Sequence, residues 1–108
     1  MTGANTLRGE VLLPIAGTPW LLRPTFAALV AAEEELGPLF ALVERAGAGT
    51  LRLAEMTALF WHCLAERDGQ PRGSLTREAV GEAVVAQGLA ACAVPLRTLL
   101  AQILKGAP

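Results

Sequence analysis

The feature that most constrains this chain is a change in hydrophobic period at Arg23-Pro24-Thr25-Phe26. Before it, Val11, Leu13 and Ile15 fall on one face of an extended chain, the period of two that is typical of a half-buried strand. After it, apolar residues recur every three to four positions, as they do along one face of a helix. The sequence therefore predicts a small β-structure near the N-terminus, followed by helices.

Residues 7–23 predict a β-hairpin. Its turn is expected at Ala16-Gly17, because glycine tolerates positive φ. Pro14 and Pro19 cannot donate to a ladder, but both strands of a two-stranded ribbon are edges, so each proline can direct its missing N–H outward. Because an isolated hairpin is barely stable, its apolar face is expected to lie on the helices.

Residues 25–105 predict a bundle of four to five short helices. The first begins after the N-cap Thr25, carries the stripe Phe26, Leu29, Val30 and Leu36, and ends at Gly37-Pro38. The others are expected from Pro38 to the break at Gly47-Ala48-Gly49, over 53–66, from the cap Thr76 to Gly88, and over 89–105 with a disturbance at Pro95. The predicted class is mainly α with a small β part (α+β), in a single domain of residues 1–108 with loose termini at 1–6 and 106–108. Gly81 is expected to thin one side of the fourth helix so that another backbone can approach.

Charge and targeting signals indicate a cytoplasmic chain that binds neither nucleic acid nor membrane. The net charge is −1, the sequence pI is about 5.8, and the arginines are scattered among glutamates, so no basic stripe forms. The longest uncharged stretches, 11–22 and 83–96, are shorter than the roughly 20 apolar residues of a membrane span. Residues 1–8 lack the order of a signal peptide.

No combination of residues in the sequence is suited to catalysis or to metal binding. The single histidine, His62, neighbours Cys63, but consecutive helical residues point about 100° apart and cannot chelate one ion together. Cys63 and Cys92 lie in apolar runs and are expected to be buried, inert free thiols with raised pKa. Gly47-Ala48-Gly49 follows a helix and lacks the lysine of a phosphate loop. We expect no enzyme activity, no cofactor and no metal, and a structural role for His62.

The three glutamates at 33–35 are expected to have different roles. Glu34 and Glu35 are expected on a solvated helix face. Glu33 follows Phe26 by seven residues on the apolar stripe, so its carboxylate needs a hydrogen-bond partner. Trp61, an arginine or the N-terminus of a neighbouring helix are the alternatives, and a structural role is favoured over acid–base chemistry.

Apolar residues are in excess. Hydrophobic residues make up 53% of the chain and there are 11 glycines besides, against a usual combined share of about 45–50%. Alanine, which suits a GC-rich genome, explains part of the excess. The rest indicates either an unusually rich core or a surface meant for a partner, and we favour the partner surface.

Several of these segments resemble one family. Arg8-Gly9-Glu10-Val11, Gly17, Trp20 and the block 22–29 are similar to the opening of gene-transfer-agent tail-assembly proteins, which are grouped with phage tail assembly chaperones and also labelled tail tube proteins. The similarity continues through Leu36-Gly37, Leu75-Thr76 and Gly88-Leu89 and covers nearly the whole chain. The positions that carry it most clearly are Arg23, Pro24, Thr25, Phe26, Glu33, Gly37 and Trp61. Pro14, Pro19 and Pro95 depart from the family pattern.

The resemblance implies a chaperone that binds the tail tape-measure protein or tail tube protein during assembly and is absent from the finished particle. It implies no catalytic residues. A partner helix would dock in a groove formed by the last helix and the helix over 53–66, with Met56, Leu59, Leu96, Leu99 and Ile103 as candidate interface residues. The alternatives are a structural tail subunit that self-assembles through the hairpin edges, forming a homo-oligomer, and a helix-turn-helix DNA-binding regulator.

Overall fold

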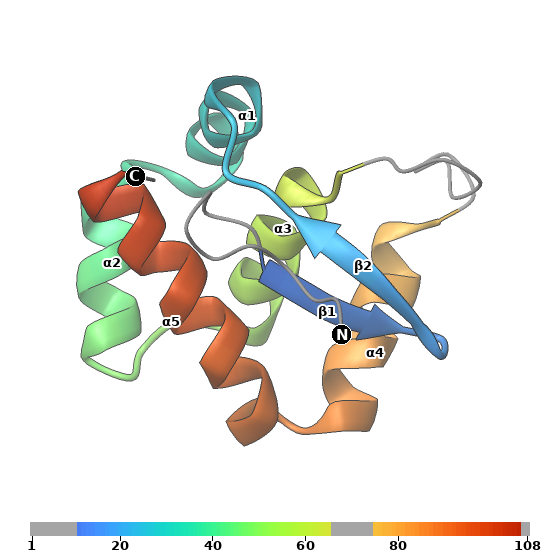
Figure 1. Cartoon of the computed structure of the whole chain (residues 1–108). Helices are drawn as coiled ribbons and strands as arrows, with labels where there is room; N and C mark the ends of the chain where they lie inside the picture. The colour runs from blue at the N-terminus through green and yellow to red at the C-terminus, as the bar shows by residue number, and fades with distance from the viewer. Residues whose placement is uncertain (1–10, 66–74, 107–108) are drawn as a thin grey trace.

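The computed structural model describes residues 11–65 and 75–106. In chain order these residues form β1 (Val11–Ile15), β2 (Thr18–Leu22), α1 (Phe26–Leu36), α2 (Leu39–Gly47), α3 (Leu53–Cys63), α4 (Arg77–Gln87) and α5 (Leu89–Lys105). The predicted α+β class is confirmed: a two-stranded hairpin lies against helices (Figure 1). The predictions for residues 1–10, 66–74 and 107–108 lie outside the described residues. Gly106, expected in a loose terminus, caps α5 through its N–H and the Gln102 carbonyl.

The hairpin forms where the period of two predicted it. The strands pair in antiparallel register, with Val11 opposite Leu22. Ala16 and Gly17 have φ of 52° and 82°, and two positive φ values give the type of tight turn whose twist matches that of the strands. The face that packs inward comprises Val11, Leu13, Ile15, Trp20 and Leu22.

Both hairpin prolines sit on outer edges, as expected. The Leu21 carbonyl accepts from the Ala65 N–H at 2.9 Å, so Leu21 and Pro19, two residues apart, face the outer edge of β2. Pro14 pairs with Pro19 and therefore faces the outer edge of β1. There, the side-chain amide of Gln87 donates to the Pro14 carbonyl at 2.6 Å. Neither proline removes a hydrogen bond between the two strands.

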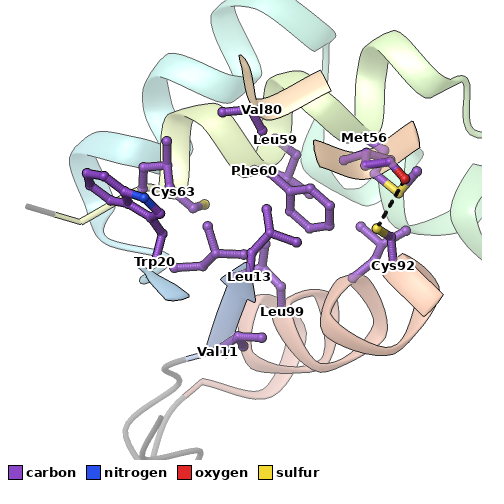
Figure 2. Packing of buried hydrophobic residues seen from close by; sticks show 14 of the residues in the cluster. Val11, Leu13, Trp20, Met56, Leu59, Phe60, Cys63, Val80, Cys92 and Leu99 are labelled. Atoms are coloured by element: carbon purple, nitrogen blue, oxygen red, sulfur yellow. Dashed lines mark hydrogen bonds between the residues drawn. The ribbon is translucent and has the colours of Figure 1, made fainter. Parts of the chain in front are cut away.

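Helix α3 lies at the centre of the core and packs against α1 and α4. Its buried residues are Met56, Thr57, Ala58, Leu59, Phe60 and Cys63. Figure 2 shows Leu59 and Phe60 directed into the cluster that also holds Leu13 of β1 and Leu99 of α5. The core therefore joins the hairpin to the helices, as the instability of a lone hairpin requires.

Helix α3 ends at Cys63, three residues before the predicted end. Leu64 is extended and forms a bridge with Leu22, and the Arg23 N–H donates to the Cys63 carbonyl at 2.7 Å. These hydrogen bonds satisfy backbone groups along the outer edge of β2, which a continued helix would leave open. The helical periodicity of the sequence contains no signal for this switch.

Helix α1 has the predicted ends but a different buried face. The Thr25 hydroxyl accepts from the Ala28 N–H at 3.1 Å, and Gly37, with φ of 93°, ends the helix. The buried residues are Ala28 and Ala32, whereas Phe26, expected on the inner stripe, is 85% exposed. Small alanines let α1 lie close to α3, and this close packing turns part of the predicted stripe outward.

Helices α4 and α5 follow the predicted boundaries. Thr76 caps α4, and Gly88, with φ of 94°, separates α4 from α5. A Cβ at Gly81 would meet the Thr57 side chain at 3.6 Å, so the neighbour is a side chain at ordinary contact distance rather than a closely approaching backbone. Pro95 lies inside α5 without ending it.

Both cysteines are buried free thiols, as predicted. Burial raises the pKa of the Cys92 thiol, and this thiol donates to the Val84 carbonyl at 3.8 Å (Figure 2).

Candidate functional site

Several large apolar side chains lie on the surface and are not buried in the core. The exposed members are Phe26, Val30, Phe40, Leu53, Val85, Leu89, Val94 and Leu104. Single exposed apolar residues are ordinary, but a gathered set marks a place where another molecule binds. Whether these residues form a binding surface depends on which of them lie close together.

One of them, Leu104, borders an apolar hollow between α2 and α5. One wall is the face of α5 that carries Leu96, Leu100 and Leu104, and the other is the face of α2 that carries Val43. Ala46, Gly47, Ala93 and Ala101 complete the lining together with Arg97. These small residues leave an open groove of about 560 Å³, because no side chain between the two helices is long enough to fill it.

A second hollow of about 150 Å³ continues the first, since both are lined by Val43 and Leu104. It adds Glu33, Leu39, Phe40 and Ile103. We call the two hollows together the α2–α5 trough; its two helices are seen beside each other in Figure 1. Phe40 is 78% exposed and Leu104 is 51% exposed, so both can anchor a partner without any change of the fold.

The five interface residues expected from the sequence divide between core and trough. Met56, Leu59 and Leu99 are core residues, and a partner cannot reach them while the chain is folded. Leu96 and Ile103 line the trough. The groove expected between α3 and α5 is not among these hollows: their lining includes residues of α2 and none of α3. Phe40 and Leu104, which are exposed and line the trough, are not among the five, because periodicity identifies the apolar face of a helix but not whether a neighbour covers it.

Glu33 stands at the end of the trough near the start of α2. Its carboxylate accepts from the Leu39 N–H at 3.1 Å. Of the three partners considered from the sequence, the N-terminus of a neighbouring helix is confirmed. Because Glu33 is exposed rather than set in a buried stripe, it caps α2 and joins it to α1.

Glu35 is exposed, as the sequence predicts, but its side chain is paired rather than only solvated. Its carboxylate oxygens lie 2.8 Å from His62 Nε2 and 2.5 Å from a guanidinium nitrogen of Arg77. The hydrogen bonds from Arg77 first and His62 second lower the pKa of Glu35 to about 2. The Arg77 guanidinium also lies 5.9 Å from the centre of the Trp61 ring. This cluster ties α1, α3 and α4 together and confirms a structural, hydrogen-bonded His62.

Within 11–65 and 75–106, no three His, Cys, Asp or Glu side chains are grouped so that they could hold a metal ion. No single helix there is long and apolar enough to cross a membrane; α4 and α5 have the necessary length and apolar composition only together, as a pair bent by 118°.

Comparison with known proteins places the chain among tail proteins of phages. A sequence model of the family described as phage tail tube protein, GTA-gp10, matches residues 8–106, which include both walls of the trough. No curated protein and no solved structure matches the chain.

Proposed function

We propose that this chain, which belongs to the phage tail tube protein family GTA-gp10, is a non-enzymatic tail assembly chaperone. In this role it covers an apolar helical segment of the tail tape-measure protein while the tail forms, and it is absent from the finished particle. The observation that carries the proposal is the α2–α5 trough, an open apolar groove between two helices.

The trough suits the docking of a helix. A helix that lays its apolar face into such a groove is a common mode of peptide recognition. Each large apolar side chain that becomes fully buried contributes about 1.5–3 kcal/mol. Phe40 and Leu104 would close over the docked helix from the two walls. An apolar stripe that is covered in this way cannot aggregate before the tail tube surrounds it.

The second candidate is a structural tube subunit, which the description of the matching family favours. Self-assembly by strand addition needs free N–H and C=O groups along an edge. In this hairpin, Ala65 already occupies part of the β2 edge, and Pro14 and Pro19 present no N–H to either edge. The hairpin is thus a poor template for another strand, which supports the chaperone over the subunit.

The proposal is tested by co-expression with the tape-measure protein of the same gene cluster. Leu104→Asp and Phe40→Asp place a charge at the trough and should abolish co-purification while the circular dichroism spectrum stays unchanged. Leu53→Asp is the matched control, because Leu53 is also exposed but lies at the start of α3, outside the trough lining. Co-purification that survives both trough substitutions would show that a different surface binds the tape-measure protein.

Mass spectrometry of purified particles separates the two candidates. A chaperone is missing from them, whereas a tube subunit is present in many copies. The chaperone role also places the chain in the bacterial cytoplasm, where tails assemble; fractionation of producing cells checks this location.

A further inference from the structure

We infer that the helix accepted by the α2–α5 trough carries carboxylates along one side of its apolar stripe, and that these carboxylates lie against Arg97 and Lys105 of α5. The inference rests on the proposed function for the kind of partner, and it adds the chemistry by which that partner is selected and oriented.

The lining of the trough indicates a helical occupant. It consists almost entirely of apolar side chains on α2 and α5, whose backbone groups are hydrogen-bonded within their own helices. An extended segment would bring unpaired N–H and C=O groups against this lining and would find no partners for them. A helix satisfies its own backbone. The lining residues Ala93 to Leu104 span about 16 Å along α5, enough for about three turns.

The charges on α5 are all of one sign. Arg97 and Lys105 are its only charged side chains, both are exposed, and neither forms an ion pair with another of the described residues. Arg97 lines the trough itself. Lys105 follows Arg97 by eight residues, which places it about 12 Å further along the axis and about 80° around it, beside the trough rather than in its lining.

The opposite wall does not cancel these charges. On α2, the Arg45 guanidinium is paired with Glu55 at 2.6 Å, and Glu44 is not among the residues that line the trough. The trough therefore has a basic wall on α5 and one carboxylate, that of Glu33, beside the start of α2. A docked helix matches this arrangement when carboxylates about two turns apart face α5. Electrostatic complementarity of this kind fixes orientation and excludes wrong partners more than it adds affinity.

The experiment uses two synthetic peptides of about 20 residues, a length at which helices begin to be stable. Both carry the same leucine stripe; in one the residues flanking one side of the stripe are Glu, and in the other they are Lys. Binding to the full chain is followed by fluorescence anisotropy at low and high salt. We expect the Glu peptide to bind about tenfold more tightly at low salt, with the difference shrinking at high salt.

Arg97→Glu is expected to remove or reverse this preference. Arg52→Glu, which makes the same charge change at an exposed arginine outside the trough, is expected to leave it intact. Leu104→Asp is expected to abolish binding of both peptides. Equal affinities of the two peptides, or a preference that survives Arg97→Glu, would overturn the inference, and so would the absence of binding by either peptide.

A second copy of the chain is the competing occupant. Sedimentation of the wild-type chain and of Leu104→Asp decides this: a dimer that the substitution converts to a monomer would overturn the inference, and a monomer in both cases supports it. The inference can fail while the chaperone role stands, since the tape-measure protein can co-purify without any dependence on Arg97. Detection of the chain in finished particles refutes the chaperone role itself, whatever the peptides do.

Discussion

Helices α3 and α5 are both rich in apolar residues, but they differ in how completely the fold buries them. In α3, every residue from Met56 to Phe60 is buried, because α1 and α4 pack against it. Helix α5 packs against β1 and α4, and its face toward α2 stays open along the trough. Leu104, which lines the trough, is exposed, and so are Leu89 and Val94 elsewhere on α5. Burial of an apolar helix is thus decided by which of its faces the neighbouring elements cover rather than by its own composition.

The same substitution in the two helices gives the largest contrast. Leu59→Ala in α3 removes a side chain that is 0% exposed and is expected to destabilise the chain by about 2–5 kcal/mol, because a cavity remains in the core. Leu104→Ala in α5 is expected to change the free energy of unfolding by no more than about 0.5 kcal/mol. Urea denaturation measures both. Similar losses at the two sites would mean that the trough is closed in solution and would break the comparison.

Two glycines test the packing next to the two helices: Gly81 lies within α4 on the side toward α3, and Gly88 lies at the junction of α4 with α5. Gly88→Ala, at the junction with α5, is expected to cost about 1–3 kcal/mol, because φ of 94° with ψ of 144° is a region open almost only to glycine. Gly81→Ala, on the side toward α3, is expected to stabilise the chain by up to about 1 kcal/mol, since alanine favours the helix. The added Cβ would meet Thr57 only at 3.6 Å. Thermal unfolding should move in opposite directions for the two; a destabilising Gly81→Ala would indicate tighter α3–α4 packing than the structure has.

The two buried cysteines report on how easily each helix opens. Cys63 belongs to α3 and Cys92 to α5. Because the face of α5 toward α2 is open along the trough, the local opening of α5 should cost less than that of α3. In single-cysteine variants, iodoacetamide should label Cys92 faster under native conditions, about tenfold for each 1.4 kcal/mol between the two opening energies. Equal rates, with both thiols exposed only by global unfolding, would show that α5 is held as firmly as α3.

The smallest expected effect concerns pH. Glu35 helps to hold α1 on the α3 side of the molecule, and its pKa is lowered from 4.5 to about 2. A group with a lowered folded-state pKa stabilises the chain above the unfolded value, so this contribution is present above about pH 5 and is lost as the pH falls toward 2. Because Glu35 is 39% exposed, solvent screening limits the contribution to about 0.5–1 kcal/mol.

Glu35→Gln is expected to lower the free energy of unfolding at neutral pH and to flatten its dependence between pH 5 and 2. Glu34→Gln, also exposed on the same helix, is the control, since no ion pair joins the Glu34 side chain to another of the described residues. If the two variants follow the same pH profile, the Glu35 cluster does not hold α1 in solution.

The sequence by itself determined the order and ends of most elements. The period of two before Pro24, the caps at Thr25 and Thr76, and the glycines at 37 and 88 each act within a few residues along the chain, so local chemistry suffices to place them. The same holds for the outward placement of the hairpin prolines. The family, too, could be recognised from residues alone.

Only the tertiary structure decided which apolar faces are covered. The outward turn of Phe26, the early end of α3 at Leu64, the pairing of Glu35 with His62 and Arg77, and the opening between α2 and α5 all depend on segments distant in the chain. The position of Arg97 on the trough wall depends on the same packing. Hydrophobic periodicity is a property of one helix, whereas burial is a property of a helix and its neighbours. The position of the candidate site therefore depends on tertiary packing.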